Sequence, residues 1–184
     1  TAVLLARMNG FDPGPMETAK LCRRAENEFV SVQCGLLDQV TSVFGRKGML
    51  VHLDCRDESV RSVPFFEGFG FLIINSGVRH ELTGGEYNER RAACHEAARL
   101  LGVGTLREAT PEMLEAAGLP DLPARRARHV VGENRRVVEG LGAMERGDAE
   151  GFGRLMTASH RSSMENFENS TPELDMLVEL ATAT

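Results

Sequence analysis

Apolar residues in the first part of the chain recur every three to four positions, at Leu21, Cys22, Ala25 and Phe29. This spacing predicts an amphipathic helix over 15–29, and Pro15 suits its first turn. Shorter helices are expected on either side, at 1–8 and at about Asp38–Phe44. A turn centred on Gly35 should lead into the second of them.

A strand region follows these helices. Apolar and polar residues alternate at Met49, Val51, Leu53 and Cys55. The alternation predicts a half-buried strand over 48–55, and Val60–Phe65 is a candidate partner strand. Phe69–Asn75 is a continuous apolar run, which predicts a strand covered on both faces.

Helical patterns fill the rest of the chain, over 86–101, over 121–146 and after the capping residues Thr110, Asp148 and Thr171. Gly102 is a typical helix stop, and a proline follows Thr110 and Thr171 at the first helical position. The predicted fold class is therefore α+β and helix-rich. The region 56–67, with its charges, serines and Pro64, is the candidate domain junction, and it divides the chain into 1–57 and 58–184.

Composition disfavours nucleic acid as a partner. The 184 residues carry a net charge of −6, no Trp and one Tyr, whereas a binder of phosphate backbones usually has a basic excess. A basic run lies on the predicted 121–146 helix, at Arg125, Arg126, Arg128, His129, Arg135 and Arg136. Because Glu133 and Glu139 share that helix, we interpret the run as a solvated or interdomain salt-bridged face.

The sequence also gives expectations for the cellular location of the protein and for metal-binding motifs. No uninterrupted apolar stretch approaches the roughly 20 residues that span a bilayer, so no membrane association and a cytoplasmic location are expected. The cysteines are widely spaced and match neither a zinc motif nor a dense disulfide framework. They are Cys22, Cys34, Cys55 and Cys94.

Several stretches together resemble galactokinases of the GHMP small-molecule kinase superfamily. They are AENEFVSVQCGLLDQ, VHLDCR, NSGVRHELTGGEYNERRAAC, LREAT, RRARHVVGENRRV and STPELDMLVELA. Mild departures from the family pattern occur at Ser31, at Leu36-Leu37 and at Gly85. The family's sugar-recognition segment, its Gly/Ser-rich phosphate loop and its C-terminal glycine-rich motif have no counterpart here. The resemblance thus implies an internal part of a longer two-domain kinase, which we expect to be inactive by itself.

The resemblance implies an ATP-dependent enzyme that phosphorylates the carbon-1 hydroxyl of galactose. Asp38 matches the family's catalytic carboxylate, as a base or an orienting group, and Gly35 would let the substrate approach the backbone. The alternative for Asp38 is a helix cap or first-turn acid. Glu26, twelve positions earlier, matches the magnesium-binding glutamate. Its alternative is a solvated acid late in a helix.

The same resemblance assigns residues further along the chain. Tyr87 matches a sugar-contacting tyrosine, and its alternative is a tyrosine with its hydroxyl in water. Apart from the resemblance, Arg79, Thr83 and Gly85 lie in a loop before the Tyr87 helix. Because a helix N-terminus with nearby glycines can hold an anion, we expect this loop near the nucleotide. Its alternative is a common turn. Residues 1–57 would complete the N-terminal, nucleotide-binding catalytic domain, and residues 58–184 would form part of the C-terminal α+β domain.

Two other functions fit the same residues. One is a related sugar kinase of the superfamily, acting on an N-acetylated galactose. The other is a non-catalytic sensor that binds galactose and ATP and regulates transcription through a partner. The sequence leaves the oligomeric state open.

Overall fold

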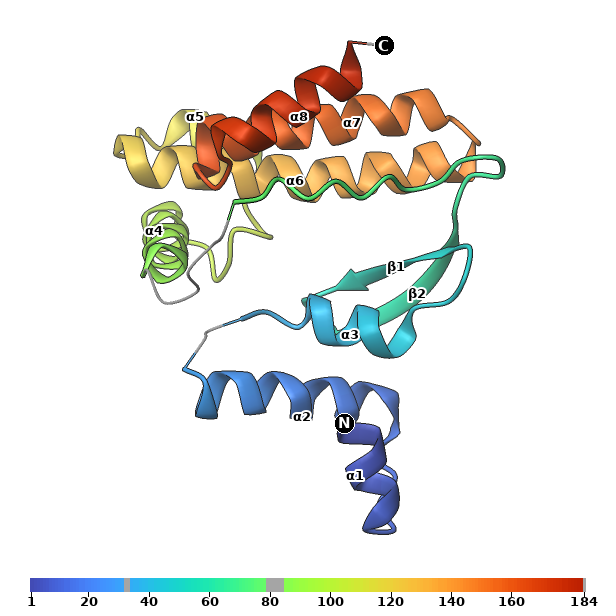
Figure 1. Cartoon of the computed structure of the whole chain (residues 1–184). Helices are drawn as coiled ribbons and strands as arrows, with labels where there is room; N and C mark the ends of the chain where they lie inside the picture. Colours follow the sequence, from blue (N-terminus) through green and yellow to red (C-terminus); the bar gives the residue numbers. More distant parts are fainter. Residues whose placement is uncertain (32–33, 79–84, 184) are drawn as a thin grey trace. The chain divides into compact units, whose positions relative to one another are not determined.

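The computed structural model describes residues 1–31, 34–78 and 85–183. It divides the chain into two compact units, Thr1–Phe69 and Gly70–Thr184. Figure 1 shows the helices and the β-hairpin of these units. The predicted helix-rich α+β class is confirmed for the described residues.

The first unit consists of three helices and a β-hairpin. The helices are α1 (Ala2–Met8), α2 (Gly14–Phe29) and α3 (Leu37–Phe44), and the strands are β1 (Met49–Asp54) and β2 (Ser59–Pro64). The strands pair antiparallel, with Val51 opposite Ser62. The predicted strand pair is therefore confirmed, and the three predicted helices lie within one residue of their expected ends.

The core of the first unit lies between α2, α3 and the hairpin. Its buried residues are Ala19, Leu36 and Val40, and partly buried side chains from β1 and β2 pack against them. Val40 is fully buried. Because Leu36 and Val40 are four positions apart, they lie on one face at the start of α3 and fix this end of the helix against α2.

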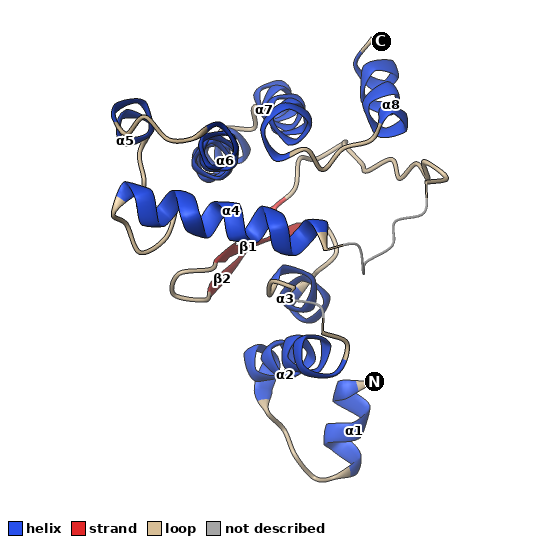
Figure 2. Cartoon of the chain, turned by 90° about the vertical axis from the view of Figure 1, so that its left-hand side faces the viewer, coloured by secondary structure: helices blue, strands red, loops and turns tan. Residues whose placement is uncertain are grey.

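The second unit is helical. Its elements are α4 (Glu86–Leu101), α5 (Pro111–Ala116), α6 (Asp121–Glu145), α7 (Ala149–Ser162), the π-helical turn η1 (Ser163–Phe167) and α8 (Pro172–Thr182). Figure 2 shows α6 and α7 side by side, seen along their axes. The predicted caps are confirmed, because Thr110, Asp148 and Thr171 each accept a hydrogen bond from a backbone N–H of the following turn.

Small residues let the helices of the second unit pack closely. Ala97, Ala98 and Ala127 are buried where α4 meets α6. A Cβ added at Gly140 of α6 would meet the ring of Phe152 of α7 at 3.4 Å. The ring of Phe152 thus packs directly on Gly140, at an ordinary van der Waals distance from where a Cβ would lie.

The predicted strand over Phe69–Asn75 is wrong. Residues 69–78 have no regular secondary structure. Leu72 is 84% exposed and Ile73 is 92% exposed. A strand requires a neighbour for its backbone hydrogen bonds, and the two-stranded sheet among the described residues contains only β1 and β2.

The domain junction predicted between 57 and 58 falls in the turn that joins β1 to β2. Because residues 59–64 pair with residues 49–54, the hairpin stays together and the compact units separate only after Phe69. The assignment of 1–57 and 58–184 to the two domains of a whole kinase stays a prediction.

Among the described residues, no helix combines the length and the apolar character that a membrane crossing requires.

Candidate functional site

Glu26 and Gln39 form a polar contact between α2 and α3. The side-chain amide of Gln39 donates a hydrogen bond from Nε2 to Oε1 of Glu26, over 2.9 Å. The sulfur of Cys34 lies 3.2 Å from the other carboxylate oxygen, Oε2, and 3.4 Å from Oδ1 of Asn27, so these two acceptors share its single thiol hydrogen. Both oxygens of Glu26 are thus engaged, although Glu26 itself is exposed in the last turn of α2.

These hydrogen bonds keep Glu26 ionised. The donation from Gln39, followed by that from Cys34, lowers the pKa of the Glu26 carboxyl below its ordinary value, against a smaller opposing effect of burial. Burial, and then the neighbouring Glu26, raise the pKa of the Cys34 thiol. Cys34 therefore remains protonated near neutral pH and serves as a hydrogen-bond donor.

The carboxylate of Glu26 has the chemistry of a magnesium ligand. Magnesium is commonly held by one or two carboxylates together with nucleotide phosphates and water. An ionised carboxylate can accept about four hydrogen bonds or ligands, and Glu26 has used one position on each oxygen. In the described parts of the chain no three His, Cys, Asp or Glu side chains are grouped to hold a metal.

Asp38 lies in the first turn of α3 and is exposed. The N-cap of α3 is Leu36, so Asp38 is a first-turn acid and does not cap the helix. The next two residues, Gln39 and Val40, are buried. Since consecutive helical residues point about 100° apart, this burial leaves Asp38 on the solvent side. Among the described residues its carboxylate has no hydrogen-bond or ion-pair partner.

The structure describes three of the other predicted site residues, which are Gly35, Gly85 and Tyr87. Gly35 precedes α3 with φ outside the left-handed region, and an added Cβ would meet nothing within 4 Å, so the space beside it is open. Gly85 is the N-cap of α4 with φ 77°, which a glycine adopts without strain. Tyr87, one residue into that helix, is 52% exposed. Arg79 and Thr83 lie outside the described residues.

Several arginines of the basic run on α6 form ion pairs within the second unit. Arg135 pairs with Glu139 over 2.6 Å, and Arg136 pairs with Glu133. Arg126 does not fit the prediction of a solvated face, because it is only 6% exposed. Its guanidinium donates to the backbone carbonyl of Asn166 and to the carboxylate of Glu168.

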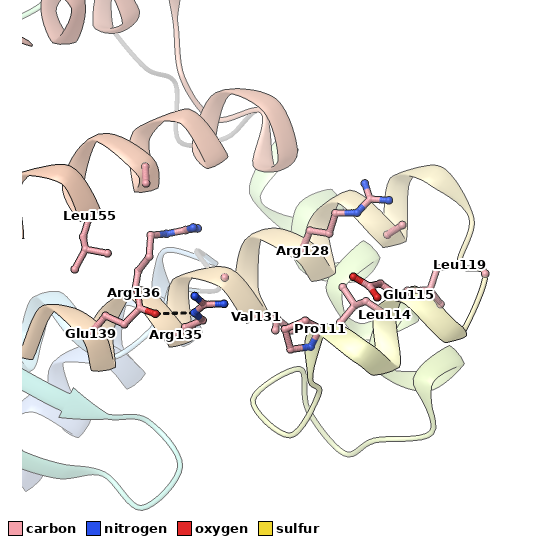
Figure 3. Close-up of a pocket in the computed structure, with 14 residues that line it drawn as sticks. Pro111, Leu114, Glu115, Leu119, Arg128, Val131, Arg135, Arg136, Glu139 and Leu155 are labelled. Atoms are coloured by element: carbon pink, nitrogen blue, oxygen red, sulfur yellow. Dashed lines mark hydrogen bonds and ion pairs between the residues drawn. The ribbon is translucent and has the colours of Figure 1, made fainter. Parts of the chain in front are cut away.

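A pocket of about 640 Å³ lies in the second unit, between α5, α6 and α7. Figure 3 shows its mixture of apolar and charged side chains, with the Arg135–Glu139 pair at one side and Arg128 at the other. It includes none of the predicted site residues. The pocket is a packing groove between helices that carries its own ion pair.

Sequence reasoning missed Gln39 and the donor role of Cys34. Both belong to the stretch CGLLDQ that contains Asp38. Glu26 lies thirteen positions before Gln39, and no helical or strand periodicity links residues so far apart across a turn. Only the packing of α3 on α2 brings them together. The nearest available signal was a glutamine beside a candidate catalytic aspartate.

Comparison with known proteins finds relatives of this chain. No protein-family model matches it. Human galactokinase is 48% identical over 170 residues, which cover 90% of this chain and 43% of that protein. Galactokinase of Actinobacillus pleuropneumoniae is 43% identical over 173 residues, covering 91% and 45%. Galactokinase of Thermotoga neapolitana is 41% identical over 180 residues, covering 97% and 51%.

A solved structure agrees with these relatives. The crystal structure of Lactococcus lactis galactokinase complexed with galactose has a TM-score of 0.94 and 30% identity to this chain. The match covers 100% of this chain and 49% of the other. The chain thus spans about half the length of the curated relatives that it matches.

Proposed function

This chain is homologous to galactokinases over about 90% of its length and corresponds to about half of theirs, and from this premise we propose that the whole protein is an ATP-dependent galactokinase. It would transfer the γ-phosphoryl group of ATP to the carbon-1 hydroxyl of galactose. The observation that carries the proposal is the pair of carboxylates on adjacent helices. Glu26 is engaged through Gln39 and Cys34, whereas Asp38 is exposed without a partner among the described residues.

Asp38 suits the role of base or orienting group in this reaction. The hydroxyl proton of the sugar would pass to, or be oriented by, its carboxylate. The hydroxyl oxygen would then bond to the γ-phosphorus while the bond to the bridging oxygen of ADP breaks. A positioned general base typically contributes about 10²–10⁴ in rate. The exposure of Asp38 supports this role, because a sugar hydroxyl can reach it.

Glu26 suits the binding of the magnesium that accompanies ATP. Its carboxylate is ionised and has acceptor capacity left after the two hydrogen bonds that it accepts. Magnesium bound there would neutralise negative charge on the nucleotide phosphates. The role of Glu26 would be to supply a carboxylate ligand to that magnesium.

The remaining assignments complete the proposal. Gly35, with open space beside it, would let the substrate approach. The exposed Tyr87 could pack its ring on the sugar and share a hydrogen bond through its hydroxyl. Arg79, Thr83 and Gly85 are proposed near the nucleotide. A cytoplasmic location and inactivity of residues 1–184 by themselves belong to the same proposal.

Substitution of Asp38 in the full-length protein tests the function. Asp38→Asn should lower galactose turnover, measured by release of ADP, at least about 10²-fold. Asp57→Asn is the matched control, because Asp57 is exposed and its carboxylate accepts a hydrogen bond from Ser59, which an asparagine can also accept. Near-normal turnover of Asp38→Asn would remove Asp38 from its role.

The same assay separates the two other functions. Faster turnover of N-acetylgalactosamine than of galactose would identify the related sugar kinase. Binding of galactose and ATP with no turnover by the unsubstituted protein would identify the sensor.

A further inference from the structure

Gln39 is a buried polar residue that the reaction itself does not require. It is 7% exposed and lies on α3 between the exposed Asp38 and the fully buried Val40. A buried amide stabilises the fold only where its polar atoms find partners. Its amide nitrogen donates to Glu26 over 2.9 Å and lies 3.8 Å from the sulfur of Cys34.

The amide oxygen of Gln39 shows that packing does not account for this residue. Among the described residues, Oε1 of Gln39 is buried without a hydrogen-bond partner. An unsatisfied buried acceptor is costly, and an apolar side chain of similar shape would avoid that cost. The opposite orientation of the amide would turn its oxygen toward the carboxylate of Glu26 and place two acceptors together. The donation to Glu26 is therefore the interaction that explains a glutamine here.

The geometry also makes Gln39 a rigid support. The buried residues Leu36 and Val40 anchor α3 in the core with Ala19 of α2. Glu26, in contrast, has a long exposed side chain that is free to change rotamer unless something holds it. A donor that is locked by packing restricts the carboxylate to one orientation.

We propose that Gln39 is a positioning residue for Glu26, which holds the carboxylate in the orientation that binds magnesium-nucleotide, with Cys34 as a weaker second donor. This inference rests on the proposed function. It assigns to the Gln39 amide an effect on metal and nucleotide affinity and no direct effect on galactose binding.

The test uses the full-length protein with Gln39→Met, which keeps the length of the side chain and removes the donor. Binding of Mn²⁺ in the presence of ADP is measured by electron paramagnetic resonance, and the half-saturating Mg²⁺ concentration is measured in the kinase assay. Loss of an outer partner of a metal ligand typically costs about 10–100-fold in affinity. We expect Mn²⁺ affinity to fall about tenfold, with the KM for galactose unchanged. Unchanged Mn²⁺ affinity in a folded Gln39→Met protein overturns the proposal.

Three further variants make the result specific. Gln39→Leu, which also removes the donor, should weaken Mn²⁺ binding about as much as Gln39→Met. Glu28→Gln is the matched control for the helix and should leave Mn²⁺ affinity unchanged, since the exposed Glu28 contacts only Arg24, at 3.8 Å, among the described residues. Glu26→Gln should weaken Mn²⁺ binding. If it does not, both the magnesium role of Glu26 and this proposal fail, whereas the Asp38→Asn result still decides the kinase function.

A pair of substitutions at Cys34 covers the case in which the Gln39 variants do not fold. Cys34→Ala removes the second donor and should weaken Mn²⁺ binding severalfold. Cys34→Ser keeps a donor at the same place, so its affinity for Mn²⁺ should stay close to that of the unsubstituted protein. Equal affinities of the two Cys34 variants would overturn the positioning of Glu26 by its hydrogen-bond donors.

Discussion

Arg125 and Arg126 are neighbours on α6. Both bind the carboxylate of Glu168, but their side chains differ in solvent exposure. Arg125 donates to Oε1 of Glu168, and Arg126 donates to Oε2. The side chain of Arg125 is 27% exposed and that of Arg126 is 7% exposed. Substitution of each arginine by methionine therefore compares a partly exposed guanidinium with a buried one on the same helix and at one shared carboxylate. Arg125 also pairs with the exposed Asp121 over 3.1 Å.

The expected magnitudes follow from what each guanidinium contacts. Arg126→Met removes two charge-assisted hydrogen bonds, to the carbonyl of Asn166 and to Glu168, each worth about 1.5–3 kcal/mol. Part of this loss is offset, because Nε of Arg126 is buried without a partner among the described residues. We expect a net loss of about 2–3 kcal/mol for Arg126→Met. Arg125→Met should cost less than about 1 kcal/mol, as partly exposed pairs do.

Hydrogen exchange measured by mass spectrometry can locate the effect in the full-length protein. Arg126→Met should reduce amide protection in Ser163–Glu168, the π-helical turn and its end, because that turn is tied to α6 through Asn166 and Glu168. Urea unfolding gives the accompanying change in stability. Equal losses for Arg125→Met and Arg126→Met would refute the argument that burial sets the strength of these contacts.

Three further predictions concern stability. Val40→Ala should cost about 2 kcal/mol in urea unfolding, because it empties part of a fully buried site. Asp148→Ala should lower the melting temperature by an amount equivalent to about 1 kcal/mol, since its carboxylate accepts from the backbone N–H of Gly151 over 2.7 Å. Burial lowers the pKa of His129 below its ordinary 6.5, so its stabilising contribution is complete above about pH 6.5 and is lost as the pH falls toward the folded-state pKa. His129→Leu should flatten that part of the stability profile measured by urea unfolding at each pH.

Each of these predictions has a contradicting result. Val137→Ala, at a 49% exposed position, should cost less than about 0.5 kcal/mol, and a cost equal to that of Val40→Ala would contradict the packing argument. Asp148→Asn keeps an acceptor at the cap, so it should be milder than Asp148→Ala, and equal losses for the two would contradict the capping argument. A pH profile of the His129→Leu protein identical to that of the unsubstituted protein would assign the acid loss to other groups.

Local sequence signals predicted the helices and the hairpin well because their causes are local. The 86–101 helix has its expected ends, since Gly102 adopts the left-handed conformation that ends it. Thr110 and Thr171 cap their helices through their own hydroxyls. These features depend on neighbouring residues only, so a single sequence contains the information.

Features that depend on distant residues were predicted poorly. Phe69–Asn75 has strand composition, yet a strand exists only where another strand pairs with it. Two hydrogen bonds illustrate this. Gln39 donates to Glu26, thirteen positions away, and Arg126 donates to the carbonyl of Asn166, forty positions away. The roles proposed for Asp38, Glu26 and Tyr87 came from family resemblance. The structure adds the exposure of each residue and the hydrogen-bond partners of Glu26.

The uncovered apolar run at Phe69–Ile74 has a consequence for handling the isolated chain. Its sequence contains no charge and no proline, and Leu72 and Ile73 are almost fully in water. Such a segment is a template for pairing between molecules and for fibril-like aggregation. The 184-residue chain should therefore lose solubility as its concentration rises, and a lysine in place of Ile73 should delay that loss.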